Sequence, residues 1–218
     1  MKKFFFVSKL LGLSLIFLSL NLFAQALNAK TDYFIKGKSI LPWELSLQFR
    51  QVKLENNTGK TLRSSLVARP ASKNGENDAI RLTWKPKGIK NEWGGEDKNI
   101  LTATLTNFQK HTDLAEYKKD GVLLIDVKVL KAPRNLVELT MECAWNWKCR
   151  STIPLKNILT KLPKKKWISL PIPLKCFDDG KFDFSKVTTS FMLYTGGKMD
   201  LEIGDVRVVN FPNLNAKC

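Results

Sequence analysis

Residues 121–129 spell GVLLIDVKV, and this nonapeptide indicates the fold class before any other part of the chain. Its apolar residues Leu123, Ile125, Val127 and Val129 recur at every second position. Because successive side chains of a β-strand point to opposite faces, this period of two predicts a strand with one buried face.

The same period recurs on both sides of this segment, in short runs separated by turn-forming residues. The runs are Leu45, Leu47 and Phe49; Leu101, Ala103 and Leu105; Val137, Leu139 and Met141; Ile168, Leu170, Ile172 and Leu174; and Phe191 and Leu193. Gly- and Asn-containing turns lie between them. Many short strands with regular turns predict an all-β protein, an antiparallel jelly-roll β-sandwich.

Two of the predicted strands carry irregularities. Pro171 and Pro173 occupy the polar face of the strand near residue 170, which places that strand at a sheet edge or at a bulge because proline donates no backbone hydrogen bond. Near the C-terminus, apolar residues change parity at Gly204-Asp205, so we expect a β-bulge there. The apolar residues on the two sides of this change are Leu201 and Ile203, and Val206 and Val208.

Two segments do not follow the strand pattern. Residues 154–162 place Leu155, Ile158, Leu159 and Leu162 on one helical face, which predicts a short helix. Residues Ser64–Asp78 are polar, and we expect them to form a long loop.

The N-terminus has the pattern of a secretory signal peptide in residues 1–26. Lys2 and Lys3 precede an apolar stretch that ends at Ala24-Gln25-Ala26, a small-x-small cleavage pattern. An uncleaved anchor is the alternative, but the apolar run is shorter than the about 20 residues that a span requires. We therefore expect a periplasmic or secreted mature protein without a membrane span, consisting of one β-sandwich domain over residues 27–218.

The chain is strongly basic, with a formal net charge of +16. Removing residues 1–26 removes Lys2, Lys3 and Lys9 and no acid, which leaves 16 − 3 = +13. Such a charge attracts anionic polysaccharide, lipopolysaccharide, phospholipid or nucleic acid, although it also serves solubility alone. The run Lys164-Lys165-Lys166 is interpreted as a solvated turn before a strand.

The four cysteines suit an exported protein, because disulfides persist in oxidising compartments. Five residues separate Cys143 from Cys149, and a straight strand would hold their Cα atoms about 20 Å apart. A bridge needs about 7 Å or less, so the favoured Cys143–Cys149 disulfide requires a turn within residues 144–148. Cys176 and Cys218 then either pair or leave Cys218 free. The cysteine spacing and the single histidine do not match a zinc site.

From about Ile80 to Phe211 the chain resembles the galactose-binding-like β-sandwich at the C-terminus of bacterial family 3 exo-β-glucanases. Four segments carry the resemblance, and the third, with its Trp, its two prolines and its Asp-Phe-Ser-x-Val end, is the most specific. The segments are Arg81–Trp84, Gly121–Val129, Trp167–Val187 and Leu201–Val208.

This resemblance implies the sandwich fold and a role facing a glycan. In those enzymes the domain follows a catalytic barrel of about 250 residues, for which this chain leaves no room between the signal peptide and the sandwich. We therefore expect no catalytic residues and no enzymatic activity. A separate glycoside hydrolase is an expected partner, besides carbohydrate itself.

Sugar binding needs aromatic faces for the C–H surface of the ring and amides or carboxylates for its hydroxyls. Trp145 and Trp147 lie on the predicted disulfide-closed tip, and they are either binding residues or a continuation of the apolar face of residues 137–141. Trp93 lies in a polar, Gly-rich loop beside Asn91 and Glu92, which makes these three residues candidate carbohydrate contacts. The other tryptophans with an assigned place, Trp84 and Trp167, are expected in the core.

The acidic loop offers two further possibilities. Glu92, Glu96 and Asp97 could pair for glycoside hydrolysis, or could hold a structural calcium, as could Asp205 at the bulge. Nucleophilic catalysis would have to use His111, the single histidine, in a polar surface segment.

The sequence therefore predicts an exported, non-catalytic module that binds a β-glucan or another glycan, with no catalytic residues, no resident metal and no nucleic-acid partner. A basic envelope protein that binds anionic surface polymer is the alternative, and a small glycoside hydrolase is the third hypothesis.

Overall fold

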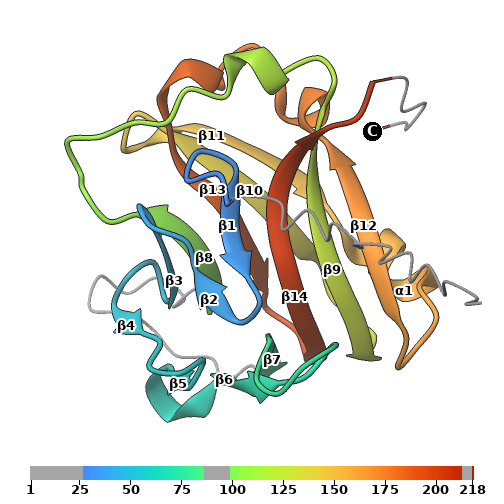
Figure 1. The fold of residues 1–218 in the computed structure, drawn as a ribbon. Helices are drawn as coiled ribbons and strands as arrows, with labels where there is room; N and C mark the ends of the chain where they lie inside the picture. The colour runs from blue at the N-terminus through green and yellow to red at the C-terminus, as the bar shows by residue number, and fades with distance from the viewer. Residues whose placement is uncertain (1–26, 86–98, 213–217) are drawn as a thin grey trace, which may run out of the picture.

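The computed structural model describes residues 27–85, 99–212 and 218, and it consists mostly of β-strands in two facing antiparallel sheets (Figure 1). Within these residues the first sheet has eight strands: β1 (Asp32–Ile35), β2 (Lys38–Ser39), β5 (Gly59–Lys60), β6 (Leu66–Ala71), β7 (Ala79–Trp84), β9 (Gly121–Lys131), β12 (Trp167–Pro173) and β14 (Met199–Asn210). Its order is β12-β9-β14-β7-β6-β5, and β1 pairs with both β14 and β2.

The second sheet has six strands within the same residues: β3 (Trp43–Leu47), β4 (Val52–Lys53), β8 (Ile100–Leu105), β10 (Val137–Cys143), β11 (Asn146–Pro154) and β13 (Val187–Thr195). Their order is β11-β10-β13-β8-β3-β4. Strands that follow one another in the chain therefore often lie in different sheets. The predicted antiparallel β-sandwich is confirmed.

The core lies between the two sheets and is built by the predicted alternating residues. Leu123, Ile125, Val127 and Val129 of β9 are all buried, as are the apolar positions of β8, β10 and β13 that face them. Trp84, expected in the core, is 2% exposed, and its indole nitrogen donates to the Asn99 carbonyl. Alternation thus identified the inner faces of these strands because it depends only on the strand period.

The predicted bulge and edge strand are also present. The pairing of β14 with β9 shifts register between Ile203 and Val206, so the apolar residues on both sides of the shift point inward. At the bulge, a Cβ on Gly204 would lie 3.1 Å from Lys73 Cδ and 3.2 Å from Asp126 Cβ. The strand β12, which contains both prolines, is at the edge of its sheet.

The expected helix is α1 (Lys156–Lys161), and four short 3₁₀ helices lie elsewhere in the described chain. They are η1 (Leu62–Ser64), η2 (Ala115–Tyr117), η3 (Leu174–Phe177) and η4 (Phe184–Lys186). No helix of the described residues is both long and apolar enough to cross a membrane.

Three expectations were wrong. The segment Ser64–Asp78 is not one long loop, because β6 pairs with β7 along its whole length despite its polar residues. Phe49 does not continue β3, since the strand ends at Leu47 and residues 48–50 have positive φ. Trp167 is half-buried outside the core, where its ring faces Lys128 Nζ at 5.0 Å, because it has the opposite parity to Leu170.

Both disulfides are formed. Cys143 pairs with Cys149 as predicted, and Cys176 pairs with Cys218, which resolves the alternative that the sequence left open. The second bridge ties the chain end to η3 beside β9.

Gly37 is expected to tolerate no side chain. It has φ +76°, and a Cβ there would lie 2.1 Å from the Asn77 carbonyl oxygen. Gly180 has nearly the same φ, +78°, but open space around it. We expect Gly180→Ala to cost about 1 kcal/mol from the left-handed backbone alone and Gly37→Ala to cost about 3 kcal/mol, because the Asn77 backbone must also move. Denaturant unfolding of the two variants tests this, and equal losses would contradict it.

Candidate functional site

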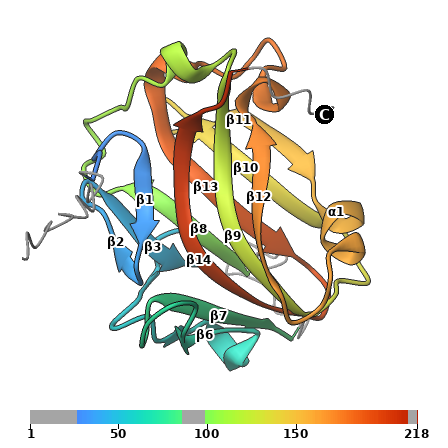
Figure 2. The same ribbon diagram turned by 45° about the vertical axis from the view of Figure 1, so that its right-hand side comes forward.

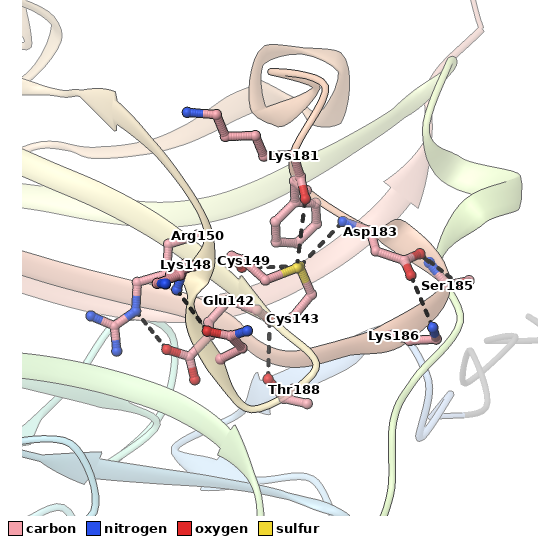
Figure 3. Close-up of a disulfide and its surroundings, with 12 residues drawn as sticks. Glu142, Cys143, Lys148, Cys149, Arg150, Lys181, Asp183, Ser185, Lys186 and Thr188 are labelled. Atoms are coloured by element: carbon pink, nitrogen blue, oxygen red, sulfur yellow. Dashed lines mark hydrogen bonds and ion pairs between the residues drawn. A yellow bond between two sulfur atoms is a disulfide. The ribbon is translucent and has the colours of Figure 1, made fainter.

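The strands β10 and β11 form a hairpin whose tip is closed by the Cys143–Cys149 disulfide, with the Cα atoms 5.2 Å apart (Figure 3). Ala144 and Trp145 make the turn with φ of 53° and 52°. The Asp183 amide nitrogen lies 3.2 Å from Cys143 Sγ, and Figure 3 shows Glu142 and Arg150 on the other side of the bridge. The tip is therefore fixed both by a covalent bond and by the neighbouring loop.

Trp145 leaves this turn and packs against the segment that follows β8. Its ring centroid lies 4.5 Å from that of Phe108, with an interplanar angle of 51°. Its indole nitrogen donates to the Lys110 carbonyl oxygen at 3.1 Å. Trp145 is half-buried, whereas the Phe108 side chain is 59% exposed. The pair thus presents an aromatic surface to solvent.

Arg50 completes this surface from a third segment. Its guanidinium lies 3.8 Å from the Phe108 ring centroid and 5.8 Å from that of Trp145, as in cation–π contacts. It also donates to the carbonyl oxygens of Leu105 and Thr106, each at 3.2 Å. Arg50, Phe108 and Trp145 are called the Arg50 cluster below.

The sheet beside the Arg50 cluster has a polar outer face. Glu44, Thr104, Thr189 and Glu142 are joined by successive strand pairings from β3 to β10, and Arg150 lies opposite Glu142 on β11. Thr104, Thr189 and Glu142 are buried although they point away from the core.

Phe49 covers part of this outer face. It follows β3, yet its ring lies 5.4 Å from the Arg150 guanidinium on β11, at the opposite side of the sheet order from β3. The segment 48–50 therefore folds back over the sheet, which positive φ at all three residues permits. This fold-back places Arg50 beside Phe108 and Trp145.

Comparison with known proteins identifies the domain. The profile of the ExoP C-terminal family, described as galactose-binding domain-like, matches residues 41–208. The chain belongs to this family. No functionally curated protein matches the chain.

Solved structures agree with this ExoP-type domain. The chain is similar to the exo-1,3/1,4-β-glucanase ExoP of a Pseudoalteromonas species, with 18% identity and a TM-score of 0.62 over 89% of this chain, but it spans 22% of that glucanase. It covers 96% of the extra C-terminal domain of ExoP, with 17% identity, a TM-score of 0.59 and 86% of this chain aligned.

A family 30 carbohydrate-binding module from a cellulosomal cellulase of Clostridium thermocellum is also similar. Its identity is 18% and its TM-score 0.55, over 84% of this chain and 98% of the module. The TM-scores show that this chain shares its fold with the ExoP domain and with this module.

The sequence left the roles of Trp145 and Trp147 undecided, and the two differ in the ExoP-type domain. Trp147 is 69% exposed with Lys148 Nζ 5.7 Å from its ring centroid, so it does not extend the core face. Trp145 packs partly against the core and partly against the Phe108 ring. The turn between Cys143 and Asn146 shifts the strand parity, which the alternation of residues 137–141 does not show.

The other predicted sugar contacts, Asn91, Glu92 and Trp93, lie outside the described residues, as do Glu96 and Asp97. The described residues contain no group of three or more potential metal ligands. Asp205 accepts a hydrogen bond from the Lys36 amide at 2.9 Å and lies 3.8 Å from Arg207. It thus holds the β1–β2 turn against β14.

Sequence reasoning did not find Arg50 and Phe108 as site residues. They lie 58 positions apart, and Trp145 follows Phe108 by another 37 positions. One sequence feature could have indicated this site: Phe108 is an isolated aromatic residue in a polar segment that follows the alternating strand of residues 101–105.

Proposed function

We propose that this chain is an exported, non-catalytic module that binds a neutral glycan of the β-glucan type through the Arg50 cluster. The observation that carries the proposal is the stacking of Arg50, Phe108 and Trp145 from three distant segments. The exposed part of the Phe108 side chain suits the C–H surface of a sugar ring. The guanidinium N–H groups of Arg50 that do not donate to Leu105 and Thr106 suit its hydroxyls.

The environment of Glu142 does not suit this residue to act as the acid of a glycoside hydrolase. Its side chain is 3% exposed and is paired with Arg150 Nε at 2.5 Å. In a glycoside hydrolase, one carboxylic acid must contact the glycosidic oxygen, and a second carboxyl group must lie about 5 to 10 Å from the first, on the other side of the scissile bond. Glu142 is held inside the sheet face and does not offer such a group to a sugar on the Arg50 cluster.

The two disulfides and the N-terminal pattern of residues 1–26 support export to the periplasm or the medium. There the module would assist a separate glycoside hydrolase by holding it near its polymer. The likeness to the extra C-terminal domain of the glucanase ExoP supports that role.

The test is a glycan array with the secreted chain at about 50 mM and about 0.5 M salt. We expect a neutral β-glucan to be bound at both concentrations, because stacking on aromatic rings depends little on screening. Incubation with the bound glucan should release no reducing sugar. Binding to anionic polymers alone, lost at the higher salt, would replace the proposal by the electrostatic alternative.

The acidic loop is tested in the same assay. Trp93→Ala is expected to reduce glucan binding, and Trp147→Ala, which removes an exposed tryptophan of the hairpin, serves for comparison. Sugar release that disappears in Glu92→Gln and Glu96→Gln would instead establish the hydrolase hypothesis.

A further inference from the structure

One end of the sandwich gathers three loops that are distant in sequence. The Lys165 amide donates to the Val129 carbonyl at 2.9 Å, which places the α1–β12 loop against the end of β9. Lys131 lies opposite Asp200, at the start of β14. A Cβ on Gly197 would lie 2.5 Å from Asn135 Oδ1, so the β13–β14 and β9–β10 loops touch. In Figure 2 the lower ends of β9, β12 and β14 converge at this end.

These loops carry a concentration of unpaired positive charge. We call them the basic end, with the exposed residues Lys131, Arg134, Lys164, Lys165, Lys166 and Lys198. None of the six forms an ion pair with any part of the chain that the structure describes. The acids that the strand register places nearby are Glu138, which is half-buried, and Asp200, which is bound by Arg81.

The basic end also exposes apolar side chains. Leu136, in the same loop as Arg134, is 52% exposed, and Ile158 on α1 is 38% exposed. Trp167, directly after the lysine run, is half-buried with Lys128 Nζ 5.0 Å from its ring. This combination is complementary to a bilayer surface. The lysines can contact anionic headgroups, and the apolar and indole groups can enter the layer beneath them. A dissolved polyanion would use the charges but not Leu136.

We propose that the basic end docks the protein on the surface of an anionic lipid bilayer, with Leu136 entering the headgroup layer. The Arg50 cluster lies at the other end of the sandwich, since β10 runs from Val137 at the basic end to Cys143 at the disulfide tip. A docked molecule would therefore present its aromatic cluster away from the membrane. This docking does not depend on the proposed glycan binding.

The test is co-sedimentation of the full secreted chain with phosphatidylcholine vesicles, with and without about 30 mol% phosphatidylglycerol. We expect binding to the anionic vesicles only, weakened by salt. Each lysine near such a surface changes partitioning about fivefold, so Lys164→Gln/Lys165→Gln/Lys166→Gln should weaken it about a hundredfold. Leu136→Asn should weaken it about fivefold at unchanged charge.

The matched control is Lys119→Gln/Lys175→Gln/Lys181→Gln, which removes the same charge from exposed lysines at the other end. This control should retain most of the vesicle binding. All of these variants should retain glucan binding, so a failure of membrane docking can be told apart from a failure of the proposed glycan binding. Equal loss in both triple variants would overturn the proposal. So would an unchanged Leu136→Asn variant together with equal binding of dissolved polygalacturonate, which would identify the basic end as a polyanion site.

Discussion

Trp145→Ala should weaken binding of a neutral β-glucan by about tenfold to a hundredfold. The substitution removes the larger ring of the Arg50 cluster and leaves Arg50 and Phe108 without their support at the disulfide tip. An aromatic ring that is covered by a sugar contributes free energy of this order. Titration calorimetry with the glucan selected on the array measures the loss directly.

Two further variants separate binding from folding, because Trp145 also packs on the core. Phe108→Ala removes a side chain that is already 59% exposed, so it should reduce affinity with little change in stability. Trp147→Ala, two positions away but outside the Arg50 cluster, is the matched control and should bind normally. If Trp147→Ala loses the glucan and Phe108→Ala keeps it, the site lies on the other side of the hairpin.

Arg150→Met should lower the free energy of unfolding by about 3 kcal/mol. The Glu142 side chain is 3% exposed, and the Arg150 Nε donates to it at 2.5 Å. Without the guanidinium a buried carboxylate has no countercharge, and the contact of Arg150 with the Phe49 ring is lost as well. Urea unfolding followed by circular dichroism gives the change in midpoint and slope.

The double variant Glu142→Met/Arg150→Met is the control for this pair. Replacing both charges by apolar side chains of similar volume should restore most of the stability, because no charge is then left buried. A double variant no more stable than Arg150→Met would show that the pair acts through packing and not through charge compensation.

Much of the fold could be predicted because it depends on local sequence. The inner face of β9, the edge position of β12 and the bulge at Gly204 follow from residue parity and proline chemistry. The favoured Cys143–Cys149 bridge is confirmed, and the turn that chain reach required between its cysteines lies at Ala144 and Trp145. The alternation of β12 could also have predicted that Trp167 lies outside the core. Trp167 directly precedes Ile168, and adjacent residues of a strand point to opposite faces.

The sequence by itself thus determined the sandwich, its core-facing residues and its disulfide tip, because strand period and chain reach act between near neighbours. Only the tertiary structure decided which side chains meet on the surface. The left-handed turn at Ala144-Trp145 separates two tryptophans that share one parity, so that one joins Phe108 and the other faces solvent. Arg50 reaches them because the backbone reverses after β3, and the lysines of the basic end meet because β9, β12 and β14 are antiparallel neighbours. Pairing between strands, not spacing along the chain, sets these neighbours, and no period in the sequence records it.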